Sequence, residues 1–157
     1  MIRAAAAVIL ASIQSFKPEN WTERPQLCSP EVRLLLAQIY QSATELYLRL
    51  SLSEHMSHPL SPSQRFAKAE LTTTLAERLQ AHCGYHLSAA WPLTVAAAAL
   101  GGGPVAQQVT LDRHLRATSD LYSSSRGVSV TLQCLRKFWA SGKTGWEDCF
   151  TEWQHSS

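Results

Sequence analysis

The sequence lacks the charge pattern that marks most nucleic-acid-binding domains. Fourteen basic and twelve acidic residues leave a net charge of only +2, and the basic residues are scattered along the chain. A DNA- or RNA-binding domain usually carries a basic stripe, because neutralising phosphates supplies most of its affinity. We therefore expect no direct nucleic-acid binding by this chain.

The sequence also lacks closely spaced cysteines. Cys28, Cys83, Cys134 and Cys149 form no Cys-x-x-Cys pair, which argues against a compact zinc site. Buried free thiols are the expected state, because cysteine is among the residue types most often buried. Two disulfides in a secreted protein remain the alternative.

No apolar run reaches the roughly 18 residues that a membrane-spanning helix needs. The N-terminus has the basic start and apolar centre of a secretory signal, over Met1 to Ala11, and Asn20-Trp21-Thr22 is a glycosylation sequon. Its centre is mostly alanine, however, which is weakly apolar and strongly helix-forming. We predict a helix of the fold here rather than a cleaved signal.

What the sequence does contain is helical periodicity, without a convincing strand. The Ser29-Pro30-Glu31 start is a strong N-cap signal. Apolar spacing and helix-stop residues predict helices over 2–16, 30–50, 63–82, 87–100, 104–121 and 128–139, with a last turn over 146–153. The expected fold is all-α, an irregular array of about six helices in one domain spanning 1–157.

The segment 87–100 differs from the other predicted helices because its LTVAAAAL stretch, residues 93–100, is apolar on every side except at Thr94. A helix of this kind is surrounded by others. We therefore predict that it is the central helix, with Pro92 in its first turn and Gly101 to Gly103 after its end. On three neighbouring helices the predicted inward residues are Phe66, Leu71, Leu75 and Leu79, then Val105, Val109, Leu111 and Leu115, and last Val128, Leu132, Leu135 and Trp139.

No cluster of reactive side chains predicts a catalytic, cofactor or metal site. The candidates are more simply a helix end, loops, a solvated face, an exposed turn and a cap: His82-Cys83-x-x-His86, His55 with His58, Asp112-Arg113-His114, Glu147-Asp148 and Gly101-Gly102-Gly103-Pro104. Four tryptophans are expected in the core or between helices: Trp91, Trp139, Trp146 and Trp153. For Trp21 the sequence leaves open a lid over the core or a contact surface.

Several segments together resemble the C-terminal half of the fungal-specific transcription factor regulatory domain, which follows the zinc binuclear cluster in many fungal activators. They are ILASIQSFKPENW, IYQSATELYLRL, AAWPLTVAAAAL and LRKFWASGKTGWEDCFTEW, from Ile9, Ile39, Ala89 and Leu135 onwards. The Trp91-Pro92-Leu93 segment and the late Phe138-Trp139 and Trp146 positions match that family's pattern.

This resemblance implies an all-helical fold, a nuclear location and transcriptional control through protein or effector contacts, with no catalytic residue to transfer. The chain lacks the family's six-cysteine cluster, so it is expected to be a truncated product, a separately expressed fragment or an incorrect gene model. In that case the first helix would expose an apolar face. We expect a regulatory module without a cofactor, whose partners are the transcription machinery or a DNA-binding subunit. The alternative is a small secreted helical protein with disulfides.

Overall fold

The structure, a computed structural model, describes residues 1–21, 28–122 and 126–150, and every regular element in this part of the chain is a helix. The all-α prediction is therefore confirmed. The longer helices are α1 (Ile2–Ser15), α3 (Pro30–Ser51), α4 (Pro62–Cys83), α5 (Ala90–Ala98), α6 (Val105–Leu121) and α7 (Arg126–Ser141). The short ones are α2 (Pro18–Trp21), η1 (Ser53–His55), η2 (Leu87–Ala89) and α8 (Trp146–Phe150).

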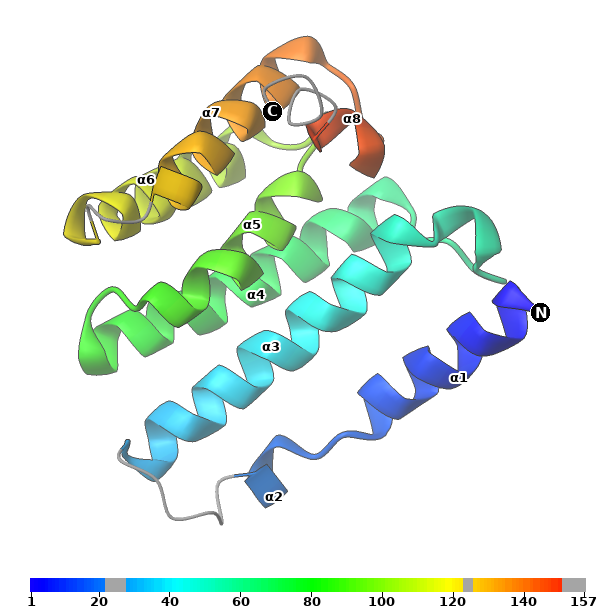
Figure 1. Ribbon diagram of the computed structural model, residues 1–157, viewed down its shortest axis with the longest axis horizontal. Helices are drawn as coiled ribbons and strands as arrows, with labels where there is room; N and C mark the ends of the chain where they lie inside the picture. Colours follow the sequence, from blue (N-terminus) through cyan, green and yellow to red (C-terminus); the bar gives the residue numbers. More distant parts are fainter. Residues whose placement is uncertain (22–27, 123–125, 151–157) are drawn as a thin grey trace.

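The long helices lie side by side and run in alternating directions along the chain. Figure 1 shows α1 beside α3 at one edge, the α6–α7 pair at the other, and α5 between them in front of α4. Helix α3 packs most extensively against α4, while α5 contacts α3, α4, α6 and α7. The core is thus built around α5.

Helix α5 confirms the predicted central helix. Every residue from Pro92 to Leu100 is buried apart from Thr94, whose hydroxyl donates to the Ala90 carbonyl at 2.8 Å. The α-helical part is shorter than predicted, because the chain enters through the 3₁₀ turn η2 and leaves the helix after Ala98. Pro92 lies in the first turn, where its missing N–H costs no intrahelical hydrogen bond.

Two Ser-Pro pairs begin the two longest helices. Ser29 accepts a hydrogen bond from the Val32 amide at 3.3 Å, as predicted. Helix α4 starts one residue earlier than predicted, because Ser61 forms a capping box with Gln64 and Pro62 occupies the first helical position.

One predicted inward residue of α4 is wrong. Leu71 is 52% exposed, and Thr72 is buried instead. A stripe of residues four apart rotates by about 40° at each step, so Leu71 drifts away from the face that Leu79 buries. The Thr72 hydroxyl is satisfied by the Lys68 carbonyl at 3.0 Å and by the Ser42 hydroxyl at 2.8 Å.

The predicted inward face of α6 is also wrong in part. Leu111 and Leu115 are buried, but Val105 and Val109 are 70% and 62% exposed. Positions 109 and 111 lie about 200° apart around a helix, so one straight helix does not bury both in the same core. The prediction for α7 is confirmed. Leu132 and Leu135 are buried, and Val128 and Trp139 are partly buried and pack against the core.

The glycine run after α5 forms a tight junction between helices. Arg65 on α4 donates to the Gly101 carbonyl at 3.0 Å and to the Thr144 carbonyl at 3.1 Å. Gln108 on α6 donates to the Leu100 carbonyl at 2.9 Å. This segment is a cap and connector, as predicted, and it allows the close approach of the Phe138 ring to the backbone at Gly101.

We predict that Gly101→Ala lowers the free energy of unfolding by about 2 kcal/mol, because the new Cβ overlaps the Phe138 ring and the buried core resists overpacking. That Cβ would also lie 2.8 Å from the Lys143 carbonyl oxygen. Urea unfolding followed by circular dichroism measures the change. The matched control is Gly127→Ala, whose Cβ meets nothing within 4 Å. We expect the control to be neutral or slightly stabilising, and equal losses in the two variants would contradict the account.

Candidate protein-binding surface

The histidine clusters considered in the sequence do not come together as a site. His82 and Cys83 are exposed at the end of α4, while His86 caps η2 by accepting from the Ser88 amide at 3.2 Å. His58 is exposed in the loop after η1. Within residues 1–21, 28–122 and 126–150, no three His, Cys, Asp or Glu side chains lie close enough to hold a metal ion.

The predicted solvated face holds for Arg113, which is exposed, but not for Asp112, which is half-buried, or for His114, which is buried. His114 is only 5% exposed, with its Nε2 3.1 Å from the Glu77 carboxylate on α4. Asp112 joins α6 to α7 through Arg136, at 3.1 Å from Nη2, and also pairs with Arg116. The hydrogen bond from Arg136 is the main reason that the pKa of Asp112 lies below its ordinary value. These residues have a structural role in helix pairing.

At the start of α8, Glu147 is exposed as predicted, whereas Asp148 is half-buried and lies 3.6 Å from the Lys143 ammonium. None of the four cysteines forms a disulfide. The prediction that they are buried holds for Cys149 alone, since Cys28 and Cys83 are exposed. Burial, reinforced by Cys134, raises the pKa of Cys149 to about 12, so this thiol stays protonated at neutral pH.

A continuous row of aromatic side chains is the most distinctive surface feature. We call it the aromatic strip: Tyr40, Tyr47, Trp91, Trp146 and Phe150. The Trp91 ring stacks on Tyr40 with centroids 5.8 Å apart and lies 6.0 Å from Tyr47. Trp146 meets Tyr47 edge-on at 5.3 Å and Phe150 at 5.1 Å. The strip therefore joins α3, α5 and α8.

Much of this strip faces solvent. Tyr40 and Tyr47 are each 40% exposed and Trp91 is 41% exposed, although Trp91 was predicted to lie in the core or between helices. It does lie between helices, but on their outer side. Trp139 fits the prediction better, because it is half-buried and donates to the Ala97 carbonyl at 2.9 Å. Trp153 lies outside the described residues.

Helix α1 flanks this surface and is part of the fold, as predicted. Its inner side packs Ala6, Leu10 and Ile13 against α3 and the segment that follows it, in a small second core with Leu48, Leu52 and Met56. Its outer side exposes Val8 and Ile9, so the expectation of an exposed apolar face is met. Trp21, in α2, is half-buried.

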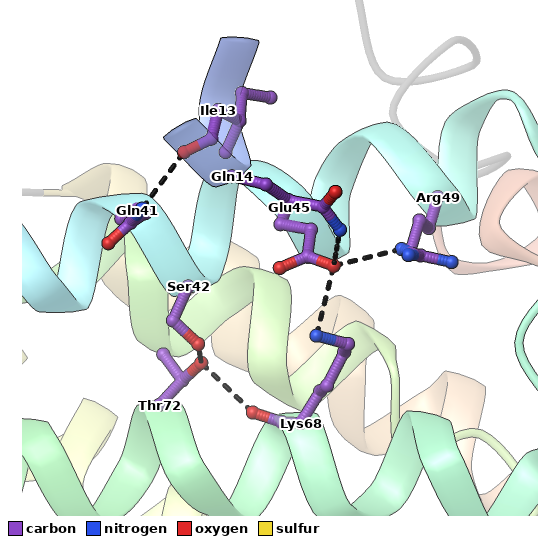
Figure 2. Close-up of polar contacts among 8 residues, drawn as sticks. All are labelled: Ile13, Gln14, Gln41, Ser42, Glu45, Arg49, Lys68 and Thr72. Carbon is purple, nitrogen blue, oxygen red and sulfur yellow. Dashed lines mark hydrogen bonds and ion pairs between the residues drawn. The ribbon is translucent and has the colours of Figure 1, made fainter. Parts of the chain in front are cut away.

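Polar contacts attach α1 to α3, and α3 to α4. Figure 2 shows Glu45 at the centre of these contacts. Its Oε1 lies 3.2 Å from the Gln14 Nε2 of α1, 3.0 Å from the Arg49 Nε and 3.0 Å from the Lys68 Nζ of α4. Gln41 donates to the Ile13 carbonyl at 2.9 Å. Partial burial alone would raise the pKa of Glu45, but the hydrogen bond and charge of Lys68, with Gln14 and Arg49, hold it below its ordinary value.

Comparison with known proteins shows which family this chain belongs to. The family model of the fungal specific transcription factor domain matches residues 6–156, so the chain belongs to this family. The chain is also similar to the phomenoic acid biosynthesis cluster-specific transcriptional regulator of Leptosphaeria maculans, with 29% identity over 150 residues. That alignment covers 90% of this chain and 27% of the relative, so the chain spans about a quarter of the relative's length.

No solved structure matches the chain. In the described residues, no helix combines the length and the apolar character that crossing a membrane requires. The match to the family model confirms, at the level of the family, the resemblance found in the sequence.

We predict that Glu45→Gln lowers the free energy of unfolding by about 1 kcal/mol at pH 7, because it removes the charge that two cations and Gln14 share. The pKa of Glu45 is lowered in the folded state, so its contribution is present at neutral pH and is lost as the pH falls through that pKa. The difference between variant and wild type should therefore shrink in urea unfolding at pH 3. Glu54→Gln, at an exposed position in η1, is the control and should differ little at either pH. A difference for Glu45→Gln that is the same at both pH values would refute this role.

Proposed function

We propose that this chain is a transcription-regulatory module that acts by contacting another protein through the aromatic strip, rather than by catalysis or direct DNA binding. Residues 1–157 would work as one unit in the nucleus, and the partner would be the transcription machinery or a DNA-binding subunit. Membership of the fungal transcription factor family supports this role. The aromatic strip, with Tyr40, Tyr47 and Trp91 exposed, is the single structural observation that carries the proposed mode of action.

The chemistry of the strip suits a protein partner. Tryptophan and tyrosine dominate the residues that contribute most to protein–protein binding, because they bury much apolar area with few rotatable bonds and keep a polar group for hydrogen bonding. The Tyr40 hydroxyl is already engaged, donating to the Ser88 carbonyl at 2.8 Å. A partner would therefore meet a preorganised surface whose side chains lose little further freedom on binding.

The charge balance supports contact with protein rather than with nucleic acid. The five strip residues include no acidic or basic residue, and the chain as a whole has a net charge of only +2. Binding at the strip would draw its free energy mainly from apolar burial.

The secreted alternative has less support. Its disulfide argument requires disulfide-bonded cysteines, and none of the four cysteines forms a disulfide in the structure. Its signal-peptide argument requires the N-terminal segment to be cleaved, whereas α1 supplies Ala6, Leu10 and Ile13 to a core cluster. Asn20 is exposed in α2, so a glycan at this residue after expression in a fungal host would favour secretion. Nuclear accumulation of a fluorescent fusion would favour the regulatory role.

We predict that replacing Tyr47 and Trp91 together by alanine removes at least about half of the regulatory effect, because aromatic anchors supply most of an interface's free energy. The chain would be fused to an unrelated DNA-binding domain, and reporter output in a fungal host compared with that domain alone. Val105→Ser with Val109→Ser is the matched control, since both residues are exposed and apolar on α6. Protein levels and thermal unfolding are compared for each variant.

A reporter effect that survives the strip variant but disappears with the α6 variant would place the contact elsewhere. A wild-type fusion that behaves like the DNA-binding domain alone would overturn the proposed function.

A further inference from the structure

A concave apolar site lies beside the aromatic strip, where α2 and η2 meet α3. It is a cavity of about 410 Å³, lined by Phe16, Trp21, Leu36, Ala37, Tyr40 and Ser88. A second hollow of about 320 Å³ shares Phe16 and Tyr40 with it and continues along α3 to Thr44. The larger cavity falls within the usual size of small-molecule sites, about 300–1,000 Å³.

The walls of this cavity are held in place by contacts on three sides. Gln41 of α3 donates to the carbonyls of Ile13 and Phe16, at 2.9 and 2.8 Å, and so fixes the end of α1 from which Phe16 projects. Tyr40 is held by its hydrogen bond to the Ser88 carbonyl and by stacking on Trp91. Pro18 is buried and anchors α2, which carries Trp21.

The lining selects for one kind of ligand. All six residues around the larger cavity are uncharged, and so are the four that only the second hollow adds, Ser12, Ile13, Gln41 and Thr44. A charged molecule would lose its hydration here without gaining an ion pair. Three of the six side chains are aromatic, and aromatic rings pack well against flat apolar groups.

We propose that this cavity binds a small, neutral, largely apolar molecule with a flat ring system. The site goes beyond the protein contacts proposed for the strip, because its ligand is of a different class. It shares Tyr40 with the strip, so a bound molecule would touch one residue of the proposed protein-binding surface.

The test uses the full chain and the neutral fluorescent probe N-phenyl-1-naphthylamine, whose emission rises in an apolar site. We expect saturable binding to one site, with a Kd on the order of 10–100 µM. No partner protein is present in this titration, so its failure would leave the proposed function of the strip unaffected.

Two variants test whether the probe binds in this cavity. Ala37→Phe fills the cavity from the α3 side, and Trp21→Ala removes an aromatic wall at its edge, where the main core is not involved. Each should weaken probe binding at least tenfold. If Ala37→Phe lowers the thermal unfolding temperature strongly, the Trp21→Ala result decides.

The matched control is Val8→Ser with Ile9→Ser, which removes exposed apolar side chains from the outer side of α1 and leaves the cavity lining intact. It should bind the probe as the wild type does. Loss of binding in this control alone, binding that does not saturate, or unchanged affinity in Trp21→Ala would each overturn the proposal.

Discussion

The arrangement of the other helices depends on one constraint, which is that α5 must be covered by protein on all sides. A helix without a polar face is stable only where other helices remove all of its sides from water. Four alanines in a row at 96–99, none more than 2% exposed, keep its surface narrow and let its neighbours approach closely. The chain continues from the end of α5 through Gly101, where a glycine is needed because no side chain fits between the backbone and the Phe138 ring. Arg65 stabilises this segment by donating hydrogen bonds to the Gly101 carbonyl, after α5, and to the Thr144 carbonyl, before α8.

Helix α1 lies outside this arrangement. Among the residues that the structure describes, it contributes none to the cluster around α5, and its own cluster has only Ala6, Leu48 and Met56 as buried members. Less apolar area is buried there, so the polar contacts of Gln41 and Glu45 matter more for its attachment. The cavity at Phe16 and Tyr40 follows from this layering, because it lies where the thin outer layer meets the surface of α3.

Local signals predicted much of this fold. The Ser29-Pro30 start of α3 and the apolar character of α5 act within a few residues, so they are visible without tertiary information. Which face of each helix points inward was harder to predict. Thr72, for example, is a polar residue that can be buried because its hydroxyl bonds Ser42 on α3 and the Lys68 carbonyl on its own helix. Sequence spacing aligns Tyr40 with Tyr47 on α3, but it does not show that Trp91 and Trp146 meet them to form the aromatic strip. Its members range from Tyr40 to Phe150 in sequence, and only the packing of α5 and α8 beside α3 brings them together.

Helix α3 carries both the core and the proposed surface, and its periodicity keeps them apart. Ile39, Ala43 and Leu46 are 0% exposed and point to α4 and α5, whereas Tyr40 and Tyr47 lie seven residues apart on the outer side. Two helical turns separate these tyrosines, so they align and receive Trp91 between them. A change in an outer residue removes little buried area from the α5 core. Substitutions at the outer tyrosines are therefore expected to change the surface of this helix more than the packing that specifies the fold.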